Sequence, residues 1–137
     1  MNDFLPFLND WETDPNNVKP VFERFKQFLE SCKGASLSFK ARPGVSFSLR
    51  GACPGHERDL FVMVDVVDDD PADRWLSVCF YNDQITDADE RGDWVPEGLG
   101  GLDACCFDLS TADADLATYT EARIDEAWKS SLADTLS

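Results

Sequence analysis

The sequence contains a single histidine among its 137 residues, so every mechanism that needs an imidazole would have to use His56. It also lacks the short motifs of the common catalytic and cofactor classes. It has no Gly-x-Ser-x-Gly turn, no phosphate-binding loop, no Gly-x-Gly-x-x-Gly and no His-Glu-x-x-His. We therefore predict no catalytic residue, no cofactor and no metal ion, and these absences favour a protein that is not an enzyme.

The sequence has no long hydrophobic run and no basic N-terminal segment. A helix that crosses a membrane needs about 20 predominantly apolar residues in succession, and no run here approaches that length. Residues 1–6 carry no Lys or Arg, so a signal peptide is not expected. We therefore predict a cytoplasmic protein that does not bind membranes.

Basic residues are scarce, since 12 Lys and Arg stand against 27 Asp and Glu for a net charge of −15. The field of such a protein repels nucleic-acid phosphates and anionic lipids, so direct binding to nucleic acid is not expected. General solubility is one explanation of this charge. Two functional explanations stay open, which are a basic protein partner and mimicry of the charge of a nucleic acid.

The cysteines are odd in number, and most of them lie in apolar patterns, which predicts reduced thiols in the interior; they are Cys32, Cys53, Cys79, Cys105 and Cys106. Cys53 and His56 have two residues between them, a spacing that can begin a metal site or bring a thiol beside an imidazole. A second pair of metal ligands would have to be Cys105 and Cys106, but adjacent strand residues point to opposite faces. We therefore interpret His56 as an exposed loop residue.

The hydrophobic pattern predicts five strands and two helices. Residues 60–67 and 75–81 are rich in β-branched and aromatic residues, residues 37–41 and 45–49 alternate around a Pro-Gly turn, and residues 104–109 form a fifth strand. Apolar residues at helical spacing mark a helix over 18–32, capped by Asn16 or Asn17, and another that follows a cap at Ser110 or Thr111. We predict one α+β domain over residues 1–137, with a five-stranded antiparallel meander sheet and both helices on one face. Residues 1–17 form an apolar arm that packs on the domain or exchanges with a second copy.

Two acidic segments are candidates for recognition or ion binding. Residues 82–102 predict a long polar loop, which Trp94, Val95 and Leu99 would hold against the domain. Asp87, Asp89 and Gly92 match three positions of a calcium-binding loop, but Arg91 and Gly98 fall where ligands are required. The turn 68–73, with four Asp residues, is interpreted as a solvated turn, with a loose cation site as the alternative.

Five residues are candidates for a binding site, namely Arg42, Arg50, His56, Asp65 and Trp94. Arg42 and Arg50 lie in a basic, hydroxyl-rich hairpin, where they either receive an anionic group or pair with the protein's own acids. Asp65 interrupts an apolar strand. If its face of the sheet is covered, its carboxylate needs a partner such as Arg50 or Arg74, and if that face is open it is the polar half of the alternation.

In element order and acidic charge, the chain resembles the secretion chaperones that work as dimers and wrap an extended segment of a client. The resemblance implies a protein partner and a homodimer, and it involves no shared motif. Our leading hypothesis is a non-enzymatic protein that binds another protein through the polar face of its sheet or through the 82–102 loop. One alternative is a small-ligand or enzymatic site around Arg42, Arg50, His56 and Asp65, and the other is an acidic nucleic-acid mimic.

Overall fold

Alternating polar and apolar residues build one antiparallel sheet. The computed structural model describes residues 2–136, and its strands are β1 (Ser36–Arg42), β2 (Ser46–Ala52), β3 (Val62–Val67), β4 (Trp75–Tyr81), β5 (Asp93–Leu99) and β6 (Leu102–Leu109). Their order across the sheet is β1-β2-β3-β4-β6-β5, and every neighbouring pair is antiparallel. The predicted α+β class and single domain are confirmed, with six strands where the sequence predicted five.

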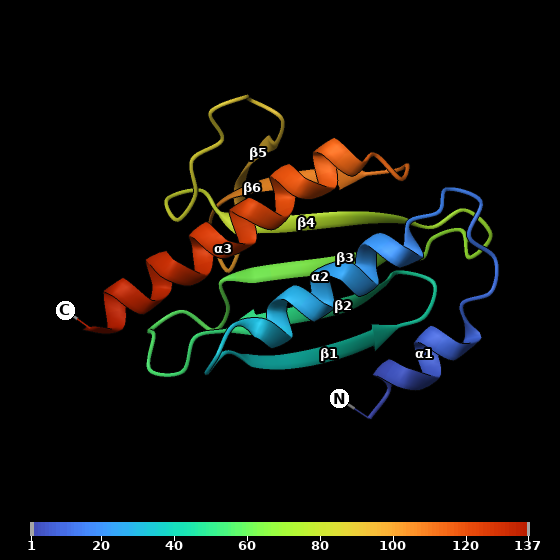
Figure 1. Cartoon of the computed structure of the whole chain (residues 1–137), viewed down its shortest axis with the longest axis horizontal. Helices are drawn as coiled ribbons and strands as arrows, with labels where there is room; N and C mark the ends of the chain where they lie inside the picture. The colour runs from blue at the N-terminus through green and yellow to red at the C-terminus, as the bar shows by residue number, and fades with distance from the viewer. Residues whose placement is uncertain (1, 137) are drawn as a thin grey trace.

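Two long helices cover one face of this sheet. The helices are α1 (Phe4–Asp10), α2 (Lys19–Ser31) and α3 (Ala114–Leu136). Figure 1 shows α2 and α3 side by side across the same face of the strands. Val64, Val78 and Phe107 point toward these helices and are fully buried. Within residues 2–136, no helix is both long enough and apolar enough to span a membrane.

The strand residues that alternate with those facing the helices point away from α2 and α3, to what we call the open face. Because residues directly opposite each other in an antiparallel pair share a face, the strand register defines its members. On β1 and β2 they are Ser36, Ser38, Lys40, Arg42, Ser46, Ser48 and Arg50, and on β3, β4 and β6 they include Met63, Asp65, Ser77, Cys79, Tyr81, Ala104 and Cys106.

Two aspartates that were not predicted as caps accept the free N–H groups at the start of the two long helices. The Asp14 carboxylate accepts hydrogen bonds from the backbone N–H groups of Val18 (3.0 Å) and Lys19 (2.9 Å). The Asp113 carboxylate accepts them from the N–H groups of Asp115 and Leu116. The predicted caps are therefore wrong by a few residues, although the physical requirement, an acceptor for unpaired N–H groups, is the same.

The N-terminal arm packs on its own chain as a short helix. Its buried aromatic residues join those of α2, β1 and β2 in an aromatic cluster made of Phe4, Phe7, Trp11, Phe22, Phe39 and Phe47. The rings of Phe7 and Phe47 stack with their centroids 4.1 Å apart. The arm therefore contributes to the core of the same chain.

The segment 82–102 is not a continuous loop, so that prediction is corrected. Residues 93–99 form β5, an edge strand paired with β6, and only residues 82–92 connect β4 to it. The Asp87 carboxylate orders this connection, because it accepts hydrogen bonds from the N–H groups of Arg91 and Gly92 and from the hydroxyl of Tyr119 on α3. The sequence pattern missed β5 because Pro96, Glu97 and Gly98 interrupt its alternation.

Candidate functional site

The open face carries a cluster of positive charge on an acidic protein. Residues 31–56 contain four Lys or Arg and no Asp or Glu, although the whole chain has a net charge of −15. The strand register places Lys40, Arg42 and Arg50 from this segment on the open face, among the serines of β1 and β2. We call these three residues the basic corner.

The cations of the basic corner do not pair with the protein's own acids. In the described part of the chain, none of Lys40, Arg42 and Arg50 lies within 4.0 Å of a carboxylate oxygen, the limit for an ion pair. The Nε of Arg50 instead donates a hydrogen bond of 3.1 Å to the hydroxyl of Ser48. The alternative of a direct ion pair with the protein's own acids is therefore not realised for these arginines, although the charges of Arg50 and Arg42 act on the nearby carboxyl of Asp65.

Asp65 lies next to the basic corner, between Ser48 of β2 and Ser77 of β4. Its side chain is half-buried, and its Oδ1 is buried with no hydrogen-bond partner among residues 2–136. Burial raises the pKa of this carboxyl, while a hydrogen bond from Ser48 and the charges of Arg50 and Arg42 act in the opposite direction. The suggested partner Arg74 pairs with Asp68 instead.

We expect replacement of Asp65 by Asn to stabilise the protein at neutral pH. A carboxyl whose pKa is raised on folding binds its proton more tightly in the folded state, so its contribution to stability decreases as pH rises above the ordinary value of 3.8. The Asp65→Asn variant should therefore unfold at a higher temperature than the wild type at pH 7, and the difference should disappear below pH 3.8. Thermal unfolding followed by circular dichroism at several pH values measures this.

The control for this prediction is Asp10→Asn, because Asp10 is exposed and any Asp→Asn change lowers the net negative charge. The prediction is contradicted if the two variants show the same pH dependence.

His56 and Trp94 do not join this cluster. The side chain of His56 is only 7% exposed, and its Nε2 lies 2.9 Å from Oδ2 of Asp134 near the end of α3. Its Nδ1 accepts the backbone N–H of Arg58, so the proton of the neutral ring is on Nε2 and points to Asp134. The interpretation of His56 as an exposed loop residue is therefore wrong. Trp94 is 64% exposed on β5, at the opposite edge of the sheet from β1, and does not anchor the 82–92 connection.

Two cavities lie away from the basic corner. One, of about 430 Å³, is lined by Gly55, His56, Glu57, Asp134 and Thr135. The other, of about 410 Å³, is lined by Asn82, Asp83, Glu97, Gly101, Leu102 and Asp103. Neither is lined by Arg42, Arg50 or Asp65, so these two cavities do not bring the four residues of the predicted ligand site together.

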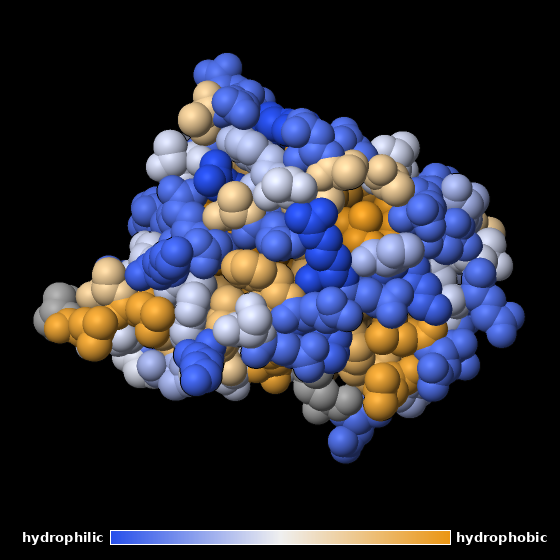
Figure 2. Space-filling view, viewed as in Figure 1, coloured by the Kyte–Doolittle hydropathy of each residue, from blue (hydrophilic) through white to orange (hydrophobic). Residues whose placement is uncertain are grey.

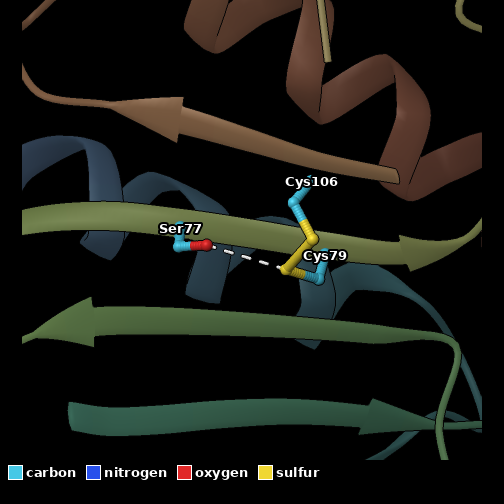
Figure 3. Close-up of a disulfide and its surroundings, with 3 residues drawn as sticks. All are labelled: Ser77, Cys79 and Cys106. Carbon is cyan, nitrogen blue, oxygen red and sulfur yellow. Dashed lines mark hydrogen bonds between the residues drawn. A yellow bond between two sulfur atoms is a disulfide. The ribbon is translucent and has the colours of Figure 1, made fainter. Parts of the chain in front are cut away.

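A disulfide between Cys79 of β4 and Cys106 of β6 corrects the prediction that the cysteines are all reduced. The two residues are direct partners in the register, with Cα atoms 4.1 Å apart, and the bond crosses between the strands on the open face (Figure 3). The neighbouring Cys105 points into the core, where burial and then the charges of Asp87 and Asp93 raise its pKa to about 11. The prediction that Cys105 and Cys106 face opposite sides of the sheet is confirmed. In the segment that the structure describes, no three His, Cys, Asp or Glu residues are grouped to hold a metal.

The far half of the open face differs from the basic corner. Tyr81, Leu99 and Ala104 are buried in a small apolar cluster there, with Leu60, Met63 and Cys106 packed against it. The guanidinium of Arg58 lies 4.3 Å from the ring centroid of Tyr81 and donates two hydrogen bonds to Asp83 (2.7 and 2.8 Å). Arg58 is thus neutralised, so that, among residues 2–136, the unpaired positive charge of the open face lies on β1 and β2.

These features define the class of the protein as an α+β domain with an antiparallel sheet, two long helices on one face and a basic corner on the other. Comparison with family models, with curated proteins and with solved structures found no match. The candidate site therefore has to be interpreted from its own chemistry. One feature of the sequence indicates this site, namely the 26 residues from 31 to 56, which contain no acid. The sequence pattern does not indicate that β1 lies at the edge of the sheet.

Proposed function

We propose that this chain is a non-enzymatic protein-binding module whose contact surface is the basic corner of the open face. The observation that supports the proposal is the set of three cations, Lys40, Arg42 and Arg50, without ion-pair partners on a protein of net charge −15. Exposed acids elsewhere on the chain form several ion pairs, as in Lys129–Asp125 and Arg91–Asp115. The basic corner is therefore suited to the carboxylates of a partner.

The position of the basic corner outside both cavities supports a protein partner over a small ligand. Small-molecule sites are concave and enclose most of their ligand, whereas the basic corner consists of side chains that project from two sheet strands. The opposite, helix-covered face is mostly hydrophilic, and its apolar surface is divided into separate patches, including one over α1 and one at the C-terminal end of α3 (Figure 2). That face offers no continuous apolar area for docking.

The test is affinity purification from the protein's own cells with two double variants of equal charge. Arg42→Gln with Arg50→Gln removes two cations of the basic corner. Lys26→Gln with Lys129→Gln removes two cations from α2 and α3 and gives the same net charge of −17, which is −15 minus 2. We expect a partner that the wild type and the helix variant retain in stoichiometric amounts, and that the basic-corner variant retains about tenfold less.

Equal retention by both double variants would exclude the basic corner as the contact surface. Absence of any stoichiometric partner would contradict the binding function itself. Light scattering coupled to size exclusion, at low and moderate salt, shows whether the partner is a second copy of the chain. If the retained partner is a basic protein, and neither double variant reduces its retention, the result would favour the nucleic-acid mimic instead.

A further inference from the structure

The two edges of the sheet differ in their capacity to pair with another strand. At the β5 edge, Pro96 has no N–H to donate, Glu97 has a left-handed backbone with φ of 54°, and the register shifts between Val95 and Leu99. Such irregularities prevent an edge from pairing with another chain. By contrast, β1 is regular over all seven residues, each paired with β2. It is therefore the edge that can accept a further strand.

The backbone groups that point outward from β1 follow from the hydrogen bonds of β2. The carbonyls of Val45 and Gly51 accept bonds from Asp68 N and Phe61 N on the β3 side. Since both N–H and C=O of a strand residue point to the same neighbour and alternate along the strand, the even-numbered residues of β2 pair with β1. The register then directs the even-numbered residues of β1 inward, and leaves Leu37, Phe39 and Ala41 with backbone groups directed to solvent.

The side chains along this edge form two rows of different chemistry. Lys40 and Arg42 are exposed on the open face and bear unpaired positive charge. Leu37 and Phe39, on the helix-covered face, are half-buried against the core. An added strand would therefore contact cations on one face and a partly covered apolar surface on the other.

We propose that β1 accepts an extended acidic segment of a partner protein as a seventh strand, in which acidic and apolar residues alternate. The acidic side chains lie opposite Lys40 and Arg42, and the apolar side chains pack beside Leu37 and against α1, whose Phe4 and Phe7 rings contact Phe39. A second copy of the chain fits this edge poorly, because pairing β1 with β1 brings four cations together on one face. The proposal rests on the proposed protein-binding function and specifies the mode of binding and the chemistry of the partner.

Fluorescence anisotropy with synthetic peptides tests the charge and the alternation. The probe is a labelled nonapeptide in which Glu and Val alternate. One control replaces each Glu with Lys, and the other has the same composition with the Glu residues and the Val residues in separate blocks. We expect the alternating acidic peptide to bind at least about tenfold more tightly than either control, and its affinity to fall with salt. Equal affinity for the alternating and block peptides would overturn strand addition.

A backbone variant tests the hydrogen bonds themselves. Ala41→Pro removes one outward N–H and leaves the inward bonds of β1 in place, whereas the matched control Ala41→Val keeps that N–H. We expect Ala41→Pro to weaken binding of the alternating peptide by about tenfold and Ala41→Val to bind as the wild type does. If Ala41→Pro does not fold, amide hydrogen exchange on the wild type replaces it, and the N–H groups of Leu37, Phe39 and Ala41 should become protected when the peptide is added.

The failure of this inference and the failure of the proposed function give different results. Strand addition is overturned if binding requires Arg42 and Arg50 but is unaffected by Ala41→Pro and by the order of Glu and Val in the peptide. The basic corner would then remain a protein-binding surface. If no peptide binds but a partner is captured through the basic corner, strand addition is likewise overturned and the protein-binding function is kept. If light scattering shows a dimer, and the same three N–H groups are protected from exchange in it, the strand that pairs with β1 comes from a second copy of the chain. The proposal of an acidic partner segment would then be overturned.

Discussion

Replacement of Arg74 by Met is expected to lower the free energy of unfolding by about 3–5 kcal/mol, the range for breaking a buried ion pair by removing one partner. Arg74 Nε donates a hydrogen bond of 2.7 Å to Oδ1 of Asp68, and the two side chains are only 13% and 4% exposed. Oδ2 of the same carboxylate accepts the N–H of Gly44 in the turn between β1 and β2. Met fills much of the volume of Arg but leaves Asp68 as a buried charge without its counter-ion.

Arg74 also joins the N-terminal arm to the sheet. Its guanidinium lies 5.3 Å from the ring centroid of Phe7 and 5.5 Å from those of Trp11 and Phe47. A cation over an aromatic face in such a site adds to the effect of the ion pair. We therefore expect the loss of Arg74 to loosen α1 as well as the turn between β3 and β4.

Urea unfolding, followed by tryptophan fluorescence and by circular dichroism, measures this change. Lys129→Met is the control, since the pair of Lys129 with Asp125 is exposed to solvent and its loss should leave the free energy of unfolding nearly unchanged. The double variant Asp68→Asn with Arg74→Met should recover part of the loss, because the uncompensated charge is then absent. A loss below about 1 kcal/mol for Arg74→Met would contradict the role of this ion pair.

The role of Asp68 illustrates what local patterns cannot predict. The run of aspartates at 68–70 was interpreted as a solvated turn, and this holds for Asp69 and Asp70, which are exposed. Asp68 is buried because its partners, Gly44 and Arg74, come from two different turns that the sheet brings together. The composition of a single turn contains no information about such a contact.

The candidate site was predictable where it depended on strand alternation. Arg42, Arg50 and Asp65 share a face because each occupies the polar position of a regular strand, and the register of β1, β2 and β3 brings these positions together. The prediction that His56 and Trp94 belong to the same site depends only on their residue types, which are common in binding sites, and not on any strand pattern. Their positions depend on the β2–β3 loop and on β5, whose irregular backbones follow no periodic pattern.

The disulfide was missed for a related reason. Cys79 and Cys106 are 27 residues apart in the sequence, and the predicted strand at 104–109 was not assigned a register against residues 75–81. The structure pairs these strands directly, so that the cysteines oppose each other on the open face. A register is a tertiary property, and it determines which of the five cysteines can meet.

Replacement of Asp87 by Ala is expected to cost about 2–3 kcal/mol, since a carboxylate that accepts several hydrogen bonds is lost. The hydroxyl of Tyr119 donates to Oδ1 at 2.6 Å, and the N–H groups of Arg91 and Gly92 donate at 3.0 and 2.8 Å. Burial acts to raise the pKa of Asp87, but these hydrogen bonds outweigh it and lower the pKa below its ordinary value of 3.8. The carboxylate therefore stabilises the fold when it is ionised.

Two measurements distinguish this role from a general effect of charge. Asp89→Ala is the matched control, because the Asp89 side chain is exposed and the contact of that residue with Tyr119 is made by its backbone N–H. The cost of Asp87→Ala should be constant above pH 3.8 and shrink as pH falls below it, since a lowered pKa gives stability that protonation removes. Hydrogen exchange should show faster exchange in residues 86–92 of Asp87→Ala and not of Asp89→Ala. Equal exchange in the two variants would mean that contacts of α3 such as Arg123 with the carbonyl of Thr86, rather than the Asp87 carboxylate, hold the connection in place.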